Sequence, residues 1–181
     1  YKTKGYTMRF FLIPIFLLFT TISFADVMRV TILGSGTPRP DIDRFSQSIL
    51  IEADGEKLLF DAGRGSAIRL SQARVNIGDI NNIFLTHLHS DHTLGIPDMI
   101  MTGWIYQRNE VLNIYGPSGT KNFIDNIKLA FIEDIKIRVE APESHSMRGL
   151  ETNVTEIEEG VIFKKNNLKV LAFVVDHGGG V

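Results

Sequence analysis

The chain has 181 residues and no cysteine, and its 19 basic and 21 acidic residues give a formal charge of −2. Hydrophobic residues make up 44% of the chain and charged residues 22%, a balance that excludes an intrinsically disordered protein. The missing cysteines exclude a disulfide-stapled mini-protein, a cysteine-based zinc finger and a cysteine-based redox enzyme. One globular domain, large enough to bury a core, remains.

The N-terminal segment is typical of an export signal. Met8 and Arg9 precede an apolar run, and the small residues Ser23 and Ala25 form a cleavage site. We therefore expect residues 1–25 to be upstream residues and a signal peptide, and the mature protein to be periplasmic or secreted. A buried helix and a membrane anchor are the alternatives. An anchor needs about 20 apolar residues, so we expect no stable membrane anchor after cleavage.

Signal cleavage would make the mature chain more acidic. Lys2, Lys4 and Arg9 lie in the segment that would be removed, residues 1–25, so 16 of the 19 basic residues would remain against 21 acidic ones. Residues 131–160 alone carry eight acidic and three basic residues. Because an acidic surface repels phosphate backbones, this balance favours a small-molecule ester substrate and disfavours nucleic acid as a partner.

The pattern of apolar and turn-forming residues predicts an α/β domain. Strands and helices are expected in the order β, ββ, α, β, α, β, α, ββ, which fits a layered domain with a mixed sheet. The predicted strands cover residues 27–33, 46–53, 57–61, 83–85, 111–115, 161–165 and 168–175, and the predicted helices cover 65–75, 93–107 and about 120–131. Residues 132–160 are polar and show no clear period.

Three of the five histidines fall within six residues, in the order His-x-His-x-Asp-His. Residues two apart in an extended segment point to the same side, so His87 and His89 can hold one ion. Asp91 and His92 follow after the chain turns, and they can face a second ion. Imidazole suits zinc, and carboxylates suit zinc, iron or manganese. The alternative is a solvated polar loop that binds no metal.

The other candidate site residues lie outside this cluster. His177 follows a predicted strand. Because zinc bound by His87 and His89 needs a further ligand, we predict that His177 is a metal ligand rather than a surface residue. His145 is expected to be a solvated loop residue. Asp61 ends a strand and is either a turn or helix-cap residue or a carboxylate that orients a ligand histidine, and both roles can hold at once.

The sequence offers few indications of which residues line the substrate pocket. Trp104, Tyr106, Arg39 and Arg44 are candidates to line it, although the two aromatic residues are equally plausible as core residues.

Several motifs resemble the metallo-β-lactamase superfamily. The segment from Thr86 to Gly95, THLHSDHTLG, is similar to its metal-binding motif. LGSGTP from Leu33, LFDAGRG from Leu59 and GIPD from Gly95 are similar to the ribonuclease Z and arylsulfatase-like branch. The resemblance covers the mature chain, residues 26–181.

This resemblance implies a fold, a metal site and a chemistry. The implied fold is an αββα sandwich, incomplete at the C-terminus, with residues 26–181 as its N-terminal part. His87, His89 and His177 would hold one zinc, and Asp91 and His92 would help to hold a second. The family also needs a bridging Asp and a final His that this sequence does not contain. We therefore expect a fragment that binds at most one zinc tightly, although the complete protein would bind two, with Mn²⁺ or Fe as alternatives.

Three functions remain open. The first is a zinc-dependent hydrolase that cleaves sulfate, phosphate or carboxylic esters with a metal-bound hydroxide that Asp91 orients, and the leader and the acidic surface favour it. The second is a ribonuclease Z-type endoribonuclease that processes the 3′ ends of tRNA, and its relatives suggest a homodimer. The third is a non-catalytic metal-binding domain, which an intact Asp91 disfavours.

Overall fold

The computed structural model describes residues 28–140 and 146–177, in which fifteen helices and strands follow one another. The predicted signal peptide and His145 lie outside the described residues, so export remains a prediction. Among the described residues, no helix has the length and apolar character needed to cross a membrane.

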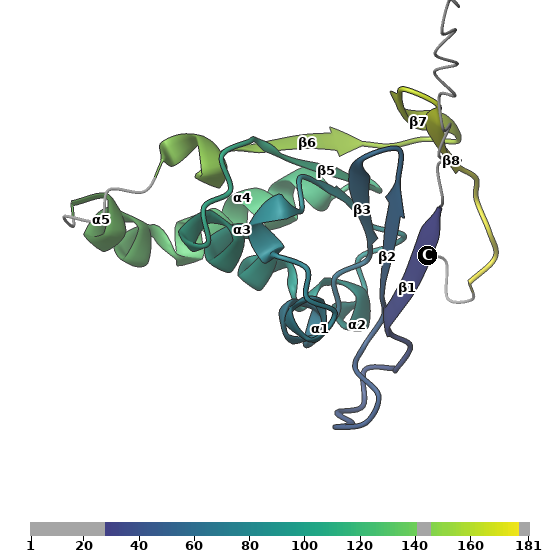
Figure 1. Cartoon of the computed structure of the whole chain (residues 1–181), viewed down its shortest axis with the longest axis horizontal. Helices are drawn as coiled ribbons and strands as arrows, with labels where there is room; N and C mark the ends of the chain where they lie inside the picture. The colour runs from purple at the N-terminus through teal and green to yellow at the C-terminus, as the bar shows by residue number, and fades with distance from the viewer. Residues whose placement is uncertain (1–27, 141–145, 178–181) are drawn as a thin grey trace, which may run out of the picture.

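A six-stranded mixed sheet forms the centre of the molecule (Figure 1). Its strands lie in chain order: β1 (Arg29–Gly34), β2 (Ser48–Ala53), β3 (Glu56–Phe60), β4 (Asn82–Phe84), β5 (Leu112–Gly116) and β6 (Thr152–Glu156). The first three strands pair antiparallel and the last three join in parallel. A separate antiparallel hairpin consists of β7 (Gly160–Lys165) and β8 (Leu168–Ala172).

The turn residues explain the two hairpins. Asp54 and Gly55 join β2 to β3, and both adopt positive φ angles, of 50° and 76°. Two-residue turns of this kind match the twist of the flanking strands, and they require residues that tolerate positive φ. Asn166 joins β7 to β8 in the same way, with a φ of 51°. Both hairpins join strands that the sequence predicts as consecutive pairs.

Helices connect the parallel strands and cover one face of the sheet. The helices are α1 (Ser66–Gln72), α2 (Ser90–Thr93), α3 (Ile96–Ile105), α4 (Thr120–Ala130) and α5 (Ile132–Glu140), with 3₁₀ turns η1 (Ile77–Asp79) and η2 (Met147–Leu150). Leu59 and Ile83 project from adjacent strands into a core that also contains Leu70 of α1 and Met99 of α3. Since strand residues alternate between faces, Phe60 and Phe84 lie on the opposite face.

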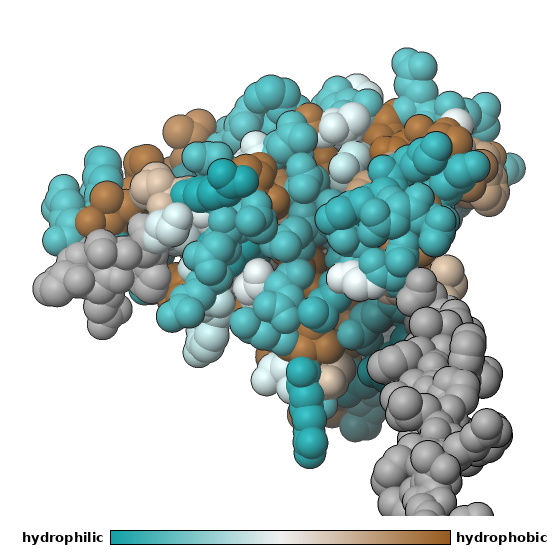
Figure 2. All heavy atoms as spheres, turned by 45° about the horizontal axis from the view of Figure 1, so that its top comes forward, coloured by the Kyte–Doolittle hydropathy of each residue, from teal (hydrophilic) through white to brown (hydrophobic). Residues whose placement is uncertain are grey.

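The β7–β8 hairpin packs on that opposite face. Phe84 stacks between Phe60 and Tyr115 at centroid distances of 4.9 and 4.8 Å, and the ring of Phe163 in β7 meets Phe84 edge-on at 5.6 Å. The sheet is therefore covered by helices on one side and by a β-hairpin on the other, which is the first part of an αββα arrangement. Figure 2 shows that hydrophilic side chains cover much of the visible surface, with hydrophobic atoms in separate groups between them.

The sequence pattern did not predict helix α5 or strand β6. Helix α5 and strand β6 both lie in residues 132–160, which we expected to be irregular. In α5 only Ile135 is buried, and the apolar period of the helix is weak. The ion pairs of Lys136 with Glu133 and of Arg138 with Asp134 stabilise the helix instead. In β6 the strand forms because its backbone pairs with β5, a contact that the local sequence does not show.

Candidate metal centre

The histidine motif lies where β4 ends and α2 begins. The buried strand residues Ile83 and Phe84 lead into the loop, and the backbone N–H of His92 donates to the carbonyl oxygen of His89 at 3.0 Å as the chain turns into α2. The hydroxyl of Thr93 donates to the same carbonyl at 3.0 Å. These bonds fix the turn, so the loop presents His87 and His89 together.

His177 joins this pair from the far end of the described chain. It follows β8, and its ring centroid lies 4.6 Å from that of His87 and 5.9 Å from that of His89. One possible ligand atom from each of the three histidines lies within 4.8 Å of the others. Nε2 of His87 lies 2.9 Å from Nδ1 of His89. The structure thus brings together the three residues that we predicted for one ion.

Asp91 and His92 form a second group beside the first. The ring centroid of His92 lies 4.0 Å from that of His87, and Nε2 of His92 lies 3.7 Å from Oδ2 of Asp91. Neither residue belongs to the group of three histidines. This arrangement matches the division into two ligand sets that we expected, and the roles of the residues as metal ligands remain predictions.

Asp61 lies behind the histidines, buried at 6% exposure. Nδ1 of His92 contacts its Oδ2 at 2.7 Å, and the backbone N–H of Thr86 donates to its Oδ1 at 2.9 Å. Its backbone has a positive φ of 56°, as expected for a residue in a tight turn. Helix α1 begins after Gly65 with no side-chain cap, so Asp61 is not a helix cap. It serves as a turn residue and as a carboxylate that holds a histidine ring.

Close backbone packing brings the Asp61 segment against α2. The N–H of Ala62 donates to the carbonyl of His92 at 2.8 Å, and the N–H of Gly95 donates to the carbonyl of Ala62 at 2.7 Å. A side chain at position 63 would overlap the carbonyl oxygen of Asp91 and crowd Ser46. Only glycine fits at position 63, which is why the turn after β3 can approach the motif so closely.

The two halves of the site differ electrostatically. Burial lowers the pKa of His87, and the neighbouring rings of His92, His89 and His177 lower it further. Burial also acts to lower the pKa of His92, but the hydrogen bond to Asp61 and the charges of Asp61 and Asp91 outweigh it, so that the pKa is raised. His87 therefore keeps a neutral ring with a free lone pair at neutral pH, as a metal ligand must.

The histidines open into a cavity of about 400 Å³. Its walls come from the loops after β4, β5 and β6 and from the chain after β8. Residues that line it are Thr86, His87, His92, Pro117, Ile157, Glu158, Glu159, Ala172, Phe173, Val174, Val175 and His177. Most of this wall could not be predicted from the sequence, because loops far apart in the chain come together only in the fold.

The pocket residues that we considered from the sequence lie elsewhere. Trp104 is a core residue at 1% exposure, and its indole N–H donates to the carbonyl of Ser146 at 2.9 Å. Tyr106 lines a cleft between α1 and α3, and Arg44 lines a small separate cavity. Arg39 is exposed and does not line the histidine cavity.

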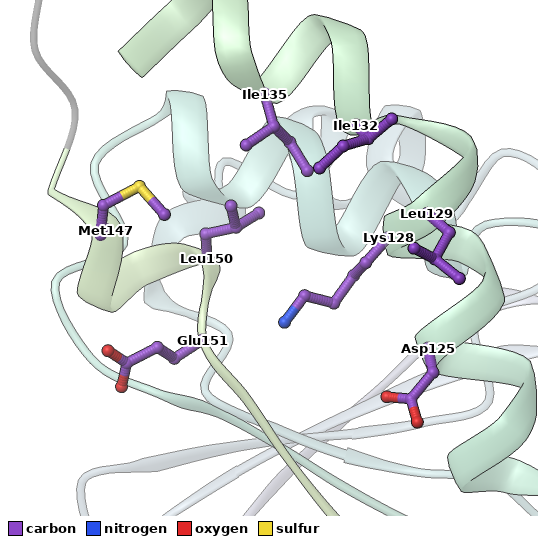
Figure 3. Close-up of a pocket in the computed structure, with 8 residues that line it drawn as sticks. All are labelled: Asp125, Lys128, Leu129, Ile132, Ile135, Met147, Leu150 and Glu151. Carbon is purple, nitrogen blue, oxygen red and sulfur yellow. The ribbon is translucent and has the colours of Figure 1, made fainter.

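Another cleft, of about 440 Å³, lies between α4, α5 and η2 (Figure 3). Ile132 and Ile135 reach it from α5 and Leu150 from η2, with Lys128 and Asp125 on the α4 side. Among the residues that the structure describes, no histidine lines this cleft. The chemistry that the sequence predicts therefore belongs to the histidine cavity.

Comparison with known families identifies the chain. The model of the family described as anti-Pycsar protein Apyc1 matches residues 28–177. The chain belongs to this family. The same residues carry the whole histidine site, from Asp61 to His177.

Curated relatives place the chain more broadly. It is 34% identical to ribonuclease Z of Methanosarcina mazei over 143 residues, which cover 79% of this chain and 44% of the relative. It is also 34% identical to ribonuclease Z of Mycobacterium sp. strain KMS over 154 residues, covering 83% of this chain and 53% of the relative. The chain thus spans about half the length of the curated relatives it matches.

Solved structures agree on the fold. The crystal structure of the short form of human tRNase Z shares 28% identity and a TM-score of 0.57, and the match covers 72% of this chain and 44% of that one. A diphosphatase of the PhnP family shares the fold at 18% identity and a TM-score of 0.54, over 80% of this chain and 57% of that chain. The predicted membership of the metallo-β-lactamase superfamily, in its ribonuclease Z branch, is confirmed.

These findings revise the order of the functions. The leader and the acidic surface favoured a small-molecule ester hydrolase, but the curated relatives favour the ribonuclease Z alternative. These curated relatives do not support a small-molecule ester as the substrate. Net charge was a weak guide because it averages over a surface, whereas a binding face is local.

Proposed function

We propose that the chain carries the metal-binding half of a metal-dependent phosphodiesterase of the ribonuclease Z type. The observation that carries the proposal is the convergence of His87, His89 and His177, whose possible ligand atoms lie within 4.8 Å of one another. Asp91 and His92 lie beside them, where a second ion would be held.

The three histidines suit zinc in number and in chemistry. Zinc–nitrogen bonds are about 2.0–2.1 Å long, so the three ligand nitrogens of one ion lie roughly 3–4 Å apart. His89 and His177 are exposed, so small rotations of their rings close the remaining distance. Three nitrogen ligands leave a fourth position open, which is the arrangement of catalytic rather than structural zinc.

The chemistry divides between the metal and the chain. A bound divalent ion supplies Lewis acidity, which polarises a phosphoryl oxygen and activates water for attack on phosphorus. In the protein, the carboxylate of Asp91, which lies 3.7 Å from Nε2 of His92, would orient the attacking water and accept its proton. Asp61 keeps the ring of His92 directed at the site through the 2.7 Å hydrogen bond. The cavity of about 400 Å³ holds the part of the substrate next to the cleaved bond.

The phosphodiester substrate is supported by the relatives rather than by the surface. Two of them, named ribonuclease Z, are 34% identical to this chain. RNA processing by the whole protein, and its assembly as a homodimer, follow from that likeness and belong to the proposal.

The experiment compares three substrates with the zinc-loaded full-length protein. We expect cleavage of bis-p-nitrophenyl phosphate and of precursor tRNA, and none of p-nitrophenyl sulfate. Asp91→Asn should lower the rate by about 10²-fold or more, because the general base is lost. Asp134→Asn, on the surface of α5, is the matched control and should leave the cleavage rate unchanged. Cleavage of the sulfate ester alone would overturn the proposal.

A further inference from the structure

Thr86 lies at a branch point of hydrogen bonds between Asp61 and two histidines. Its hydroxyl contacts Oδ2 of Asp61 at 2.9 Å and Oδ1 at 3.1 Å. The same oxygen lies 3.1 Å from Nδ1 of His87 and 3.3 Å from Nδ1 of His92. Thr86 is the first residue of the THLHSDHTLG segment, and the sequence assigned it no role.

The donors and acceptors at this branch point can be assigned by counting protons. An ionised carboxylate only accepts hydrogen bonds, so the single hydroxyl proton of Thr86 and the Nδ1 proton of His92 both point to Asp61. The hydroxyl of Thr86 then has only lone pairs left. Its contact with His87 is a hydrogen bond only if Nδ1 of His87 carries the proton and donates it.

This assignment fixes the tautomer of each ring. With the proton on Nδ1, His87 has a free lone pair on Nε2, the atom that lies 2.9 Å from Nδ1 of His89. His92 likewise has its lone pair on Nε2, the atom nearest Asp91. Each ring therefore directs a bare nitrogen to its own group of predicted ligands. Metal-binding histidines commonly donate their other ring N–H to an oxygen in this manner.

We propose that Thr86 is a positioning residue through which Asp61 orients His87 as well as His92. One carboxylate then orients a histidine in each of the two ligand groups, directly on one side and through the hydroxyl of Thr86 on the other. This inference rests on the proposed metal site, and it adds a residue that is not itself a predicted ligand to those that prepare the site.

The matched variants separate the hydroxyl from the shape of the side chain. Thr86→Val keeps the shape and removes the hydroxyl, whereas Thr86→Ser keeps the hydroxyl. Thr155→Val makes the same change at an exposed position of β6 that does not line the cavity, and is the control. All four proteins are compared as the 181-residue chain.

Two readouts are measured. Long-range ¹H–¹⁵N correlation spectra of the metal-free protein give the tautomer of His87, and competition with a chromophoric chelator gives the zinc affinity. We expect wild-type His87 to carry its proton on Nδ1 and Thr86→Val to give a mixture of tautomers. Loss of such an orienting partner costs about 10- to 100-fold in metal affinity, so Thr86→Val should bind zinc more weakly by that factor. Thr86→Ser should restore the affinity, and Thr155→Val should behave as wild type.

The outcomes separate this inference from the proposed function. Unchanged zinc affinity and an unchanged tautomer in Thr86→Val overturn the inference, and so does a Thr86→Ser variant as weak as Thr86→Val. If Thr86→Val fails to fold, a wild-type His87 with its proton on Nε2 overturns the inference by itself. Failure of the wild-type chain to bind zinc overturns the proposed function, while the tautomer still tests the role of Thr86.

Discussion

At the scale of single residues, the site depends on a buried carboxylate. Asp61 accepts hydrogen bonds from the backbone and side chain of Thr86 and from His92 while only 6% exposed. A buried charge is tolerated only when it is well satisfied, and three donors satisfy this one. The same bonds tie the end of β3 to the loop that carries the histidines, so Asp61 contributes to both the fold and the site.

We predict that Asp61→Asn weakens both zinc binding and the fold. The amide keeps the shape, but it offers one oxygen instead of two and turns an N–H group toward the donors. Because a mismatched buried polar group costs about 1–3 kcal/mol, the free energy of unfolding should fall by that amount. Zinc affinity should fall about 10- to 100-fold. Urea denaturation of the metal-free chain and chelator competition measure the two effects.

Asp79→Asn is the control for this substitution. Asp79 pairs with Lys57 at 3.1 Å on the surface, where its side chain is 48% exposed. Exposed ion pairs contribute about 0–1 kcal/mol, so Asp79→Asn should leave stability and zinc binding nearly unchanged. Equal losses in the two variants would show that Asp61 has no special role.

At the scale of elements, the sequence predicts the features whose signal lies in neighbouring residues. The hairpin at Asp54 and Gly55 and the histidine cluster are short patterns that a reader recognises from neighbouring residues. Helix α5 and strand β6 were missed because charge pairs and pairing with β5 define them. The pairing of Asp61 with His92 was anticipated only as one of two roles, since it joins residues 31 positions apart. The cavity walls after β6 and β8 were missed because only the fold brings these segments together.

The β7–β8 hairpin positions His177, which follows β8, at the site. Its hold on the sheet includes the edge-on contacts of Phe163 with Phe84 at 5.6 Å and with Tyr115 at 6.0 Å. Lys165 adds an ion pair with Glu56 at 2.6 Å. His177 therefore reaches His87 only while this hairpin stays docked.

We predict that Phe163→Ala lowers zinc affinity although Phe163 does not line the histidine cavity. Removal of a buried Phe costs about 3–5 kcal/mol, and Phe163 is only partly buried, so a smaller loss of stability is expected. The hairpin should then undock more often and withdraw His177. Phe131→Ala, at the end of α4 and 36% exposed, is the control. A variant with reduced stability but unchanged zinc affinity would contradict the prediction.

At the scale of the whole molecule, the three histidines join distant parts of the chain. His87 and His89 follow a central strand of the sheet, and His177 follows the hairpin on its outer face. An ion held by all three therefore links the sheet to the hairpin. Within the described residues, Asp91 and His92 offer a second ion only two ligands.

We therefore predict that the 181-residue chain holds one zinc ion tightly and that this ion stabilises the fold. A ligand at 100 times its Kd stabilises the native state by about 2.7 kcal/mol, which for a chain of this size raises the Tm by several degrees. Metal analysis after dialysis should give one zinc per chain, and calorimetry should show the rise in Tm. His177→Ala should abolish most of that rise, because the hairpin no longer shares the ion. Two tightly held ions in the dialysed wild-type chain, or an undiminished rise in Tm in His177→Ala, would contradict this account of how the site is assembled.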